Sequence, residues 1–457
     1  MLAKKRYAQV GLGSRSEMYT NALLEGYSET CALVGVCDNN RGRMEARQAR
    51  ARQSGVEVPG YVVDLGEDNR CGMAEFERMI AETRPDVVIV TTKDCFHDDY
   101  ICRAMELGCD VITEKPMTTD AAKCQRIIDI QRQTGKQCTV TFNYRYSPVR
   151  TQVKDLLMSG IIGEVHSVDF HWLLDTHHGA DYYRRWHRNK VNSGGLMVHK
   201  ATHHFDMMNW WLSTVPVRVY AAGSRTFYTP ETAERYGLVN RMERCLNCPE
   251  SGQCPFYLDL RNKPDLKATY LDNEQYDGYY RDQCVFSAAI DIEDSMNLVV
   301  NYQNGTLMSY SLNTSMPWEG YEVAFNGSKG RMEHKCMETI YISGDGSVPG
   351  ALRSDGTTIR IYPHFQPAYE LPIWEAVGGH GGGDSLMLQA VFAPDTANDP
   401  YLRAADQRSG AYSILTGIAA NRSMATGQAV NIADLVTGIG APAYPPMPSA
   451  AEPLPLA

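Results

Sequence analysis

The sequence lacks the features that mark membrane and secreted proteins. Its 457 residues contain no uninterrupted run of about 18 apolar residues, the length that a membrane-spanning helix needs. The short basic start, Met1–Arg6, leads directly into a strand-like segment at Tyr7–Val10, without the apolar core or cleavage site of a secretory signal. No internal repeat is present. We therefore expect a cytoplasmic protein that has no membrane partner.

An excess of positive charge is also missing. The chain carries 44 Lys and Arg residues against 54 Asp and Glu residues, which gives a net charge of -10 and a pI near 5.7. Nucleic acids would be repelled at long range, so we expect no nucleic-acid partner. The apolar content of 43% is ordinary for a globular protein, and the length exceeds what one core usually supports. Two domains are therefore expected.

A disulfide framework is not indicated by the 13 cysteines, because they are odd in number and scattered through a long chain without a secretion signal. One local cluster differs. Cys245, Cys248 and Cys254 lie within ten residues, and Cys284 is a plausible fourth member. Four thiolates could hold a tetrahedral zinc ion that stabilises a segment without a core of its own. Free thiols, a disulfide and an iron–sulfur cluster are the alternatives.

Strand-like and helix-like segments alternate along the first third of the chain. The predicted strands are Tyr7–Gly11, Ala32–Asp38, Asp86–Val90 and Val111–Thr113, and the predicted helices are Glu17–Gly26, Arg41–Gln53 and Asp98–Leu107. This alternation is typical of a doubly wound parallel sheet, that is, an α/β domain of the Rossmann type. We place this domain at residues 1–141.

The pattern changes after about Thr141. Strands are predicted at Val165–Trp172, Val217–Gly223, Met296–Tyr302, Thr306–Leu312 and Tyr321–Asn326, with helices at Val149–Met158, Lys200–Leu212 and Ala404–Met424. These segments predict an α+β domain at residues 142–440, built on a large, mostly antiparallel open sheet. A cysteine-rich insertion is expected at 240–285, and a C-terminal tail at 441–457.

The first turn has the composition of a dinucleotide-binding turn. Gly11 and Gly13 follow a strand and precede a helix, which is the context that such a turn requires, although Ser16 takes the place of the third glycine. Asp38 ends the second strand, where a carboxylate can accept hydrogen bonds from ribose hydroxyls and repel a 2′-phosphate. NAD is therefore favoured over NADP. NADP stays possible, because Arg15 or Arg41 could neutralise a phosphate.

Lys115 is the main catalytic candidate in this domain. It lies in the tripeptide Glu114-Lys115-Pro116, about a hundred residues after the glycine-rich turn. A lysine beside a dinucleotide can hold the hydroxyl or carbonyl that is oxidised or reduced, which predicts a nicotinamide-dependent oxidoreductase. The residues predicted to bind the cofactor are Gly11, Gly13, Ser14, Arg15, Asp38, Thr91, His97, Glu114 and Lys115.

Four motifs together resemble one known family. They are Val10-Gly11-Leu12-Gly13, Glu114-Lys115-Pro116, Asn143-Tyr144-Arg145-Tyr146-Ser147-Pro148, and the stretch from Gly194 to Asp206. The chain resembles the Gfo/Idh/MocA oxidoreductases, in a branch with a cysteine-rich insertion. The resemblance implies that Lys115 hydrogen-bonds the reacting oxygen and that its loop borders the nicotinamide. It also implies that the exposed face of the second sheet builds a homo-oligomer, a dimer or tetramer.

The second domain supplies the other catalytic candidates. The family usually has an Asp and, four residues later, a His, and this sequence has His199 and His203 at those positions. His203 is the candidate general acid/base, because imidazole titrates near neutral pH. His199 cannot accept two sugar hydroxyls as a carboxylate does, so substrate orientation should differ, and Lys200 could replace some of the polar contacts. Asp206 is either an orienting or a packing acid, and His204 is expected in the core.

A metal site is the alternative for the two histidines. His199 and His203 have the spacing of metal ligands on one helix face, and His380 or Asp384 could supply a third ligand. The metalloprotease pattern fails, because it needs Glu where Lys200 stands.

Further residues resemble the substrate cleft of the family. Asn143, Arg145, Arg185, Trp186 and Lys200 combine an aromatic ring with charged groups, which suits a polyol. The glycine-rich segment from Gly378 to Asp384 could close over the substrate. We therefore expect NAD(P)-dependent hydride transfer with a secondary hydroxyl of a sugar, glycoside or cyclitol. The alternatives are an NAD-dependent glycosidase or lyase that oxidises its sugar transiently, and a non-catalytic nucleotide sensor.

Overall fold

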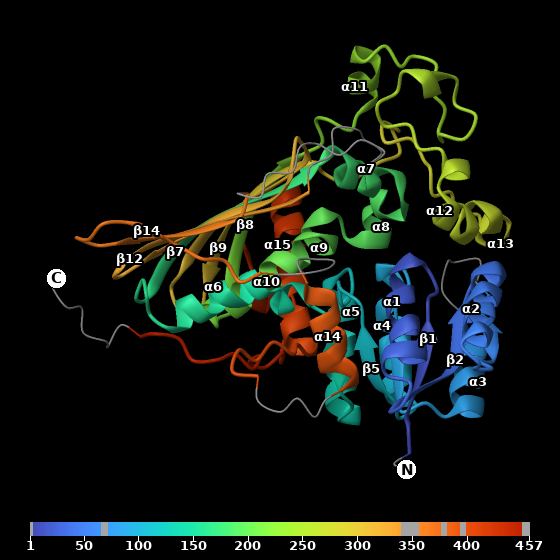
Figure 1. Ribbon diagram of the computed structural model, residues 1–457. Helices are drawn as coiled ribbons and strands as arrows, with labels where there is room; N and C mark the ends of the chain where they lie inside the picture. Colours follow the sequence, from blue (N-terminus) through green and yellow to red (C-terminus); the bar gives the residue numbers. More distant parts are fainter. Residues whose placement is uncertain (1–2, 65–71, 340–355, 376–381, 394–398, 450–457) are drawn as a thin grey trace.

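The protein contains two β-sheets, one in each half of the chain, with helices packed around them (Figure 1). The structure is a computed structural model, and it describes residues 3–64, 72–339, 356–375, 382–393 and 399–449. Among these residues no helix is both long enough and apolar enough to cross a membrane.

The first sheet has six parallel strands in the order β3-β2-β1-β4-β5-β6. Its strands are β1 (Lys5–Val10), β2 (Cys31–Asp38), β3 (Gly60–Val62), β4 (Val87–Val90), β5 (Asp110–Thr113) and β6 (Cys138–Val140). All four residues of β4 are buried, as expected for a central parallel strand with both faces covered. The α/β part of the predicted fold class is confirmed.

Short and long helices connect these strands. They are η1 (Ser14–Ser16), α1 (Glu17–Asn21), η2 (Ala22–Gly26), α2 (Arg41–Gln53), α3 (Ala74–Thr83), η3 (Asp94–Phe96), α4 (His97–Glu106) and α5 (Ala121–Thr134). The strand order reverses between β1 and β4. In open α/β sheets, ligands bind outside the carboxyl ends of the strands at such a point, so the turns after β1 and β4 are the expected binding region.

The second sheet has nine strands in the order β14-β13-β12-β11-β7-β10-β9-β8-β15. They are β7 (Val165–Asp175), β8 (Pro216–Ser224), β9 (Ser295–Tyr302), β10 (Leu307–Met316), β11 (Glu319–Gly327), β12 (Gly330–Thr339), β13 (Thr358–Pro363), β14 (Tyr369–Leu371) and β15 (Val430–Asn431). Within the described residues β7 and β10 pair in parallel, and the other neighbouring strands pair antiparallel. The predicted open, mostly antiparallel sheet is confirmed.

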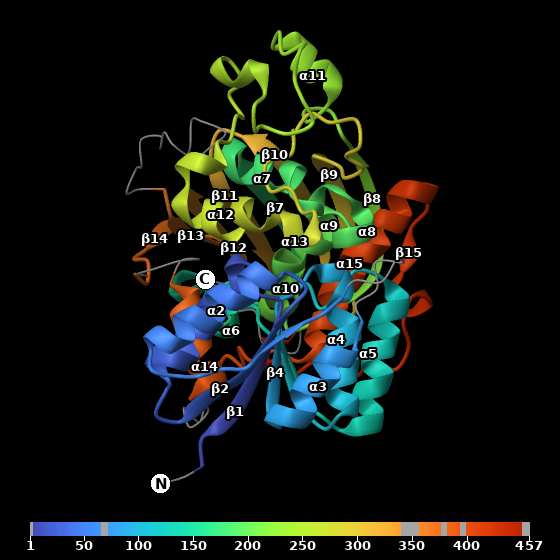
Figure 2. The ribbon, with the colours of Figure 1, turned by 90° about the vertical axis from the view of Figure 1, so that its right-hand side faces the viewer.

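Helices of the second half pack between the two sheets and at their junction (Figure 2). They are η4 (Asn143–Tyr146), α6 (Pro148–Met158), α7 (Thr176–Arg184), η5 (Trp186–Arg188), α8 (Lys190–Ser193), α9 (Leu196–His199), α10 (Ala201–Leu212), α14 (Gly383–Phe392), α15 (Gln407–Thr426) and η9 (Ile432–Asp434). Every residue of α10 is buried, because α6, α9, α15 and η4 pack around it and its His204 stacks on Trp172 of β7.

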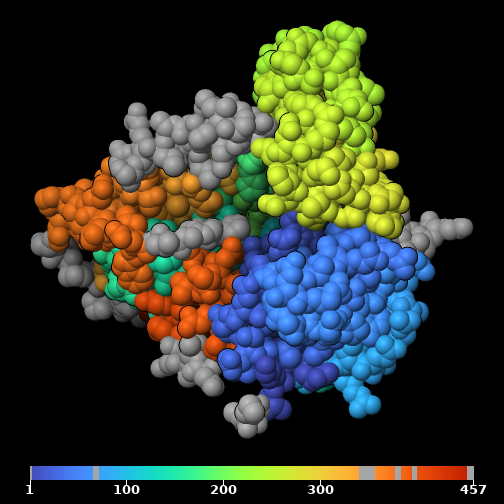
Figure 3. Space-filling model, turned by 45° about the vertical axis from the view of Figure 1, so that its right-hand side comes forward, coloured from blue at the N-terminus to red at the C-terminus, as the bar shows by residue number. Residues whose placement is uncertain are grey.

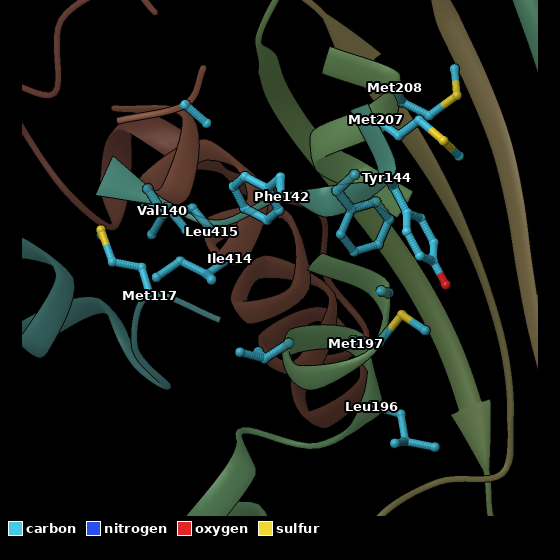
Figure 4. Packing of buried hydrophobic residues seen from close by; sticks show 14 of the residues in the cluster. Met117, Val140, Phe142, Tyr144, Leu196, Met197, Met207, Met208, Ile414 and Leu415 are labelled. Carbon is cyan, nitrogen blue, oxygen red and sulfur yellow. The ribbon is translucent and has the colours of Figure 1, made fainter. Parts of the chain in front are cut away.

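The long helix α15 joins the two sheets. It contacts α10 and β8 of the second half as well as β6 and α5 of the first. Ile414 and Leu415 of α15 lie in the same buried cluster as Val140 of β6 and Met197 of α9 (Figure 4). The residues of β6 therefore pack against α15, which also packs against β8 of the second sheet.

Helix α14 returns from the second half to pack on the first. Its Met387 and Phe392 belong to the buried cluster of β1 and β2, where the Phe392 ring meets the edge of Tyr7 at 5.2 Å between centroids. Gly383 and Asp384, which the sequence placed in a closing loop, are the first residues of this helix. The prediction for His380 and its neighbours lies outside the described residues.

The segment between β8 and β9 is an insertion made of short helices. They are α11 (Pro230–Arg235), η6 (Pro249–Gly252), η7 (Leu260–Asn262), α12 (Pro264–Thr269), η8 (Leu271–Asn273) and α13 (Glu274–Asp277). α11 lies far from the first sheet, whereas α12 and α13 lie above α1 and α2 (Figure 1). The insertion therefore reaches back across the chain to the predicted dinucleotide-binding region.

Candidate active site

A cavity of about 460 Å³ lies where the two halves meet, and it extends from the glycine-rich turn to α10. Most of the residues predicted from sequence line it. They are Gly11, Gly13, Ser14, Arg15, Asp38, Thr91, His97, Glu114, Lys115, Asn143, Arg185, Trp186, His199, Lys200 and His203. The structure thus brings the predicted cofactor-binding and catalytic residues together in one place. Arg145 is the exception.

The turn after β1 approaches the neighbouring loop very closely. Gly11 has φ +84°, and a Cβ at this position would lie 2.5 Å from the backbone nitrogen of Thr92, so glycine is required here. Ser16, at the third position of the motif, is fully buried and its hydroxyl donates to the carbonyl of Gly13 at 2.5 Å. Arg47 donates to the same hydroxyl at 2.8 Å. Ser16 is therefore hydrogen-bonded within the turn, and the turn stays closed although this residue is not glycine.

Asp38 is held in place by backbone amides and by one arginine. Its carboxylate accepts hydrogen bonds from Leu12 N at 2.5 Å and Asn40 N at 2.7 Å, and Arg43 donates to it at 3.0 Å. Arg43 was missed by the sequence reasoning, which considered Arg41; that side chain is exposed and lies 3.6 Å from Glu45. Arg43 lies five residues after Asp38, on the first turn of α2. This spacing in the sequence could have predicted that the two side chains are close.

Lys115 is half-buried, and two acids, Asp94 and Glu114, influence its pKa. Its Nζ donates to the carbonyl of His199 at 3.3 Å, which connects the two halves of the chain. Burial lowers the pKa of Lys115 from 10.5 to about 8, although Asp94 and Glu114 oppose this effect. Both ring nitrogens of His97 lie near carbonyls of this region, Pro116 O at 2.8 Å and Thr92 O at 3.1 Å. His97 therefore positions the Lys115 loop.

Glu114 and Arg15 line the cavity next to Lys115. Arg15 donates to Glu114 at 2.8 Å and to Asp384 of α14 at 3.3 Å, and Tyr19 donates to the same Glu114 oxygen at 2.8 Å. Burial alone would raise the pKa of Glu114, but Arg15 and Tyr19 outweigh it and the pKa is lowered. Asn143 also donates to Asp384, at 2.7 Å. Arg15 is thus neutralised by two carboxylates.

His199 forms a short hydrogen bond with Asp94, which the sequence reasoning missed. Nδ1 of His199 lies 2.5 Å from Oδ2 of Asp94, and the two residues are 8% and 3% exposed. Burial raises the pKa of Asp94 and lowers that of His199. Asp94 directly follows the loop after β4, where α/β sheets bind ligands, and this position was the available signal.

Aromatic rings enclose this pair. The ring of His187 lies 4.1 Å from that of His199, and Trp186 stacks on His187 at 3.6 Å between centroids. Tyr182 meets His199 edge-on at 5.5 Å. His187 and Tyr182 line the cavity but carried no motif signal in the sequence. These rings bury the His199–Asp94 pair, and burial is the main cause of both pKa changes; Lys115 and Arg185 oppose the change at Asp94 and add to the change at His199.

His203 lies one helical turn beyond His199, on α10. Its ring stacks on Tyr144 with 4.2 Å between centroids, and it is 5% exposed. Both carboxylate oxygens of Asp206 accept from Arg145 and not from His203: one accepts from Nε at 2.8 Å and the other from Nη2 at 2.5 Å. Asp206 is the packing acid of the two alternatives.

The same ion pair corrects the prediction for Arg145. Its side chain is fully buried, and it does not line the cavity, because its guanidinium is directed into α10 toward Asp206. His204, by contrast, is in the core as expected: it is fully buried, and its Nδ1 lies 2.6 Å from the hydroxyl of Tyr310.

A polar network closes the far end of the cavity. Glu319 lies 2.8 Å from Nδ1 of His178 and 3.6 Å from Nζ of Lys200. Nε2 of the same His178 lies 2.9 Å from the hydroxyl of Tyr182. Burial opposes ionisation of Glu319, but His178 and Lys200 outweigh it and lower the pKa of Glu319 to about 2. Lys200 therefore lies beside a carboxylate that is ionised at neutral pH. His178 and Glu319 were not predicted from the sequence.

The cysteine cluster does not have the arrangement of a metal centre. Cys245, Cys248, Cys254 and Cys284 line one small cavity in the insertion, yet among the described residues no group of three or more His, Cys, Asp or Glu side chains is placed to hold a metal ion. All four are free thiols, and burial raises the pKa of Cys254 to about 11. The zinc prediction is therefore not supported, and neither is a metal site of His199, His203 and Asp384; the alternative with His380 lies outside the described residues.

Comparison with known proteins agrees with the fold. The family described as "Oxidoreductase family, NAD-binding Rossmann fold" matches residues 5–142, and "Oxidoreductase family, C-terminal alpha/beta domain" matches residues 154–432. YteT of Bacillus subtilis (strain 168) is 35% identical over 434 residues, which cover 93% of this chain and 97% of YteT.

Two further relatives carry names that state an activity. D-glucoside 3-dehydrogenase of Escherichia coli (strain K12) is 24% identical over 192 residues, 42% of this chain and 50% of that enzyme. The crystal structure of the WlbA dehydrogenase from Bordetella pertussis, in complex with NADH and UDP-GlcNAcA, has a TM-score of 0.60 at 17% identity. It covers 94% of this chain and 99% of the WlbA chain, and shows the shared fold. The chain is thus an NAD-binding oxidoreductase that belongs to the Gfo/Idh/MocA family.

Proposed function

We propose that this protein is an NAD-dependent dehydrogenase that oxidises or reduces a secondary hydroxyl position of a sugar, glycoside or cyclitol. The observation that carries the proposal is the placement of Lys115, His203 and the His199–Asp94 pair in the cavity that also contains the glycine-rich turn. Proton-transferring groups and a dinucleotide site in one cavity are what an alcohol dehydrogenase needs. A nucleotide sensor would not need buried groups with displaced pKa values.

The residues around the turn fit a dinucleotide. Gly11 leaves no Cβ in front of the loop after β4, and Asp38 presents a carboxylate whose position is fixed by two backbone amides. Gly11, Gly13 and Ser14 would hold the pyrophosphate, and Asp38 the adenosine ribose. When bound, NAD accepts a hydride from the carbinol carbon or returns one to it. Asp38 and the pairing of Arg15 and Arg43 with carboxylates favour NAD over NADP.

Side chains of this protein carry out the proton transfers. A fraction of Lys115 is neutral at neutral pH, because its pKa is about 8, and its amine can then accept the hydroxyl proton of the substrate. With Asp94 ionised, Nδ1–H of His199 donates to it, so Nε2 is an acceptor for a second hydroxyl. His203, 5% exposed against Tyr144, is the second acid/base group. These roles keep Lys115, His203 and His199 as the proposed catalytic set.

A polyhydroxylated ring suits the rest of the cavity. Trp186 and Tyr182 provide flat apolar surfaces for a sugar ring, while Asn143, Arg185 and Lys200 provide polar groups for its hydroxyls. The name of the E. coli relative, a D-glucoside 3-dehydrogenase, supports the same substrate class.

The test is a survey of glycosides and cyclitols with NAD, following NADH by its absorbance. We expect reduction of NAD with at least one of these compounds, and loss of this activity in Lys115→Ala. Lys5→Ala is the matched control, because Lys5 is exposed at the opposite end of β1. Turnover by Lys115→Ala at the control's rate would refute the proposed role of Lys115.

A second candidate function is favoured by the insertion, which contacts the dinucleotide site. An enzyme that oxidises its sugar transiently, eliminates a group at the adjacent carbon and returns the hydride has to keep its cofactor between these steps. Cleavage of a glycoside by protein that carries NAD, without net formation of NADH, would favour this glycosidase or lyase reaction. Stoichiometric NADH would favour the dehydrogenase.

The exposed face of the second sheet supports a homo-oligomer. Tyr220 of β8 and Val299 of β9 are directly paired and are 51% and 47% exposed, and Leu307 of β10 is 46% exposed nearby. Large apolar side chains on adjacent strands are typical of an interface. We expect a dimer or tetramer by light scattering, and dissociation in Tyr220→Glu. Control Tyr276→Glu, at an exposed tyrosine of the insertion, should leave the mass unchanged.

A further inference from the structure

The insertion contributes a wall to the dinucleotide site. Leu266, Tyr270, Asp277, Tyr279 and Arg281 line the same cavity as the glycine-rich turn, although they lie more than two hundred residues further along the chain. In Figure 3 the surface of this segment, drawn in yellow, rests directly on the blue surface of the N-terminal half. We call residues 264–281 the cofactor clamp.

The first contact of the clamp is at the pyrophosphate turn. The hydroxyl of Tyr270 accepts from the backbone nitrogen of Ser14 at 3.2 Å and lies 3.0 Å from the Ser14 hydroxyl. These two Ser14 groups are donors that a dinucleotide-binding turn offers to phosphate oxygens. The Tyr270 hydroxyl therefore covers the Ser14 amide, and it could donate to a phosphate oxygen that takes this place.

The second contact is at the adenosine end of the site. Nδ2 of Asn40 donates to the carbonyl of Asn273 at 2.9 Å. Gly42, on the first turn of α2, makes this approach possible, because a Cβ there would lie 1.8 Å from Oδ1 of Asn273. The clamp is therefore seated on the part of α2 that follows Asp38.

The third contact neutralises Arg43. Nη2 of this arginine donates to Asp277 at 2.7 Å and to Asp38 at 3.0 Å, and the side chains of Arg43, Asp277 and Asp38 are 10%, 6% and 4% exposed. An arginine beside the acid of the second strand is the group that accommodates a 2′-phosphate in NADP-dependent enzymes. Here two buried carboxylates engage it, and one of them comes from the clamp.

The clamp is also fixed to the second half of the chain. Arg281 donates to Asp181 of α7 at 2.7 Å, and Arg244 contacts Glu274 at 3.0 Å and Asp282 at 2.8 Å. The clamp is thus held from both sides of the cavity, so displacing it requires breaking several buried or half-buried ion pairs.

We propose that the cofactor clamp completes the dinucleotide site: Tyr270 retards release of the cofactor, and Asp277 selects NAD by engaging Arg43. This inference deepens the proposed preference for NAD and rests on that part of the proposed function. Its test uses cofactor binding without substrate, so a protein that oxidises no sugar would fail the proposed function and still test the clamp.

The experiment measures NAD and NADP affinities of the full-length protein by calorimetric titration. We expect Asp277→Asn to free one side of Arg43 and to improve NADP binding relative to NAD by about tenfold or more, the scale of one charge-assisted hydrogen bond. Asp265→Asn, at an exposed acid of the same segment, is the matched control and should leave the ratio unchanged.

A second variant tests retention by a different residue. Tyr270→Phe should speed the release of NAD several-fold in stopped-flow displacement, while Tyr276→Phe, at a 46% exposed tyrosine of the clamp, should not. Melting curves show whether the variants are folded. An unchanged NAD to NADP ratio in folded Asp277→Asn, or unchanged NAD release in folded Tyr270→Phe, would overturn the proposal.

Discussion

The pH dependence of turnover is the sharpest test of the proposed chemistry, because the displaced pKa of Lys115 comes directly from its burial. The lowering from 10.5 to about 8 corresponds to a cost of about 3 kcal/mol for charging this amine in the folded protein. At pH 7 about one tenth of the molecules then have a neutral lysine, and at pH 9 about nine tenths. In the direction of alcohol oxidation, kcat/KM should therefore rise about tenfold between these pH values.

The assay is the initial rate of NADH formation at subsaturating substrate, measured across this range at constant ionic strength. Lys115→Ala should lower the rate by about a hundredfold or more and remove the rise near pH 8. Asp94→Asn should shift the rise to lower pH, because Asp94 favours the charged form of Lys115 and its removal leaves burial less opposed. A rise centred near pH 10.5, or a flat profile in the unaltered protein, would refute the assignment of Lys115 as the proton acceptor.

Three further changes have defined outcomes. His203→Ala should lower turnover by about a hundredfold and leave NAD affinity nearly unchanged in a binding titration, because His203 lies on α10 against Tyr144; weakened NAD binding would contradict this placement. Asp38→Ala should weaken NAD far more than NADP, and kinetics with both cofactors check whether the preference moves. Lys154→Met should raise the unfolding free energy by about 1–3 kcal/mol in urea titrations, because burial lowers the pKa of Lys154 to about 6 and an unprotonated lysine at neutral pH is costly. Since the unfolded chain binds more protons than the folded one between pH 6 and 10.5, stability should rise with pH in this window, and less so in the variant.

The sequence predicted the two sheets well because each has a strong local signature. Strands such as Val87–Val90 are continuously apolar, as buried parallel strands are, and the long helix α15 was placed within a few residues of its observed bounds. Short or polar elements were missed. β3 has three residues, and α13 has four, so neither contains a full period of the pattern that identifies it. The domain boundaries at 141 and 440 stay a prediction.

The predicted site residues line the cavity where a motif fixed the backbone, whereas a residue whose partner is distant in sequence can lie elsewhere. Gly11 and Lys115 are both in short motifs and both line the cavity. Arg145 is also in a motif, but its role depends on Asp206, which lies 61 residues away. No local pattern reveals that such a charge is neutralised inside the fold. Asp277 reaches Arg43 across 234 residues, and only the folded chain shows that contact.

The hydrogen bond between His199 and Asp94 changes the role expected for His199. The sequence suggested that a carboxylate had been lost from the substrate domain, which would leave one polar contact fewer for the substrate. The structure instead places Asp94, from the loop after β4, 2.5 Å from Nδ1 of His199, so the carboxylate acts from the opposite domain through an imidazole. When His199 donates Nδ1–H to Asp94, its Nε2 is a single acceptor, whereas a carboxylate offers two oxygens. Because Asp94 also lies close enough to Lys115 to influence its pKa, the substrate-orienting and proton-accepting groups are electrostatically coupled. A change at His199 should therefore alter the pH dependence of turnover as well as substrate affinity.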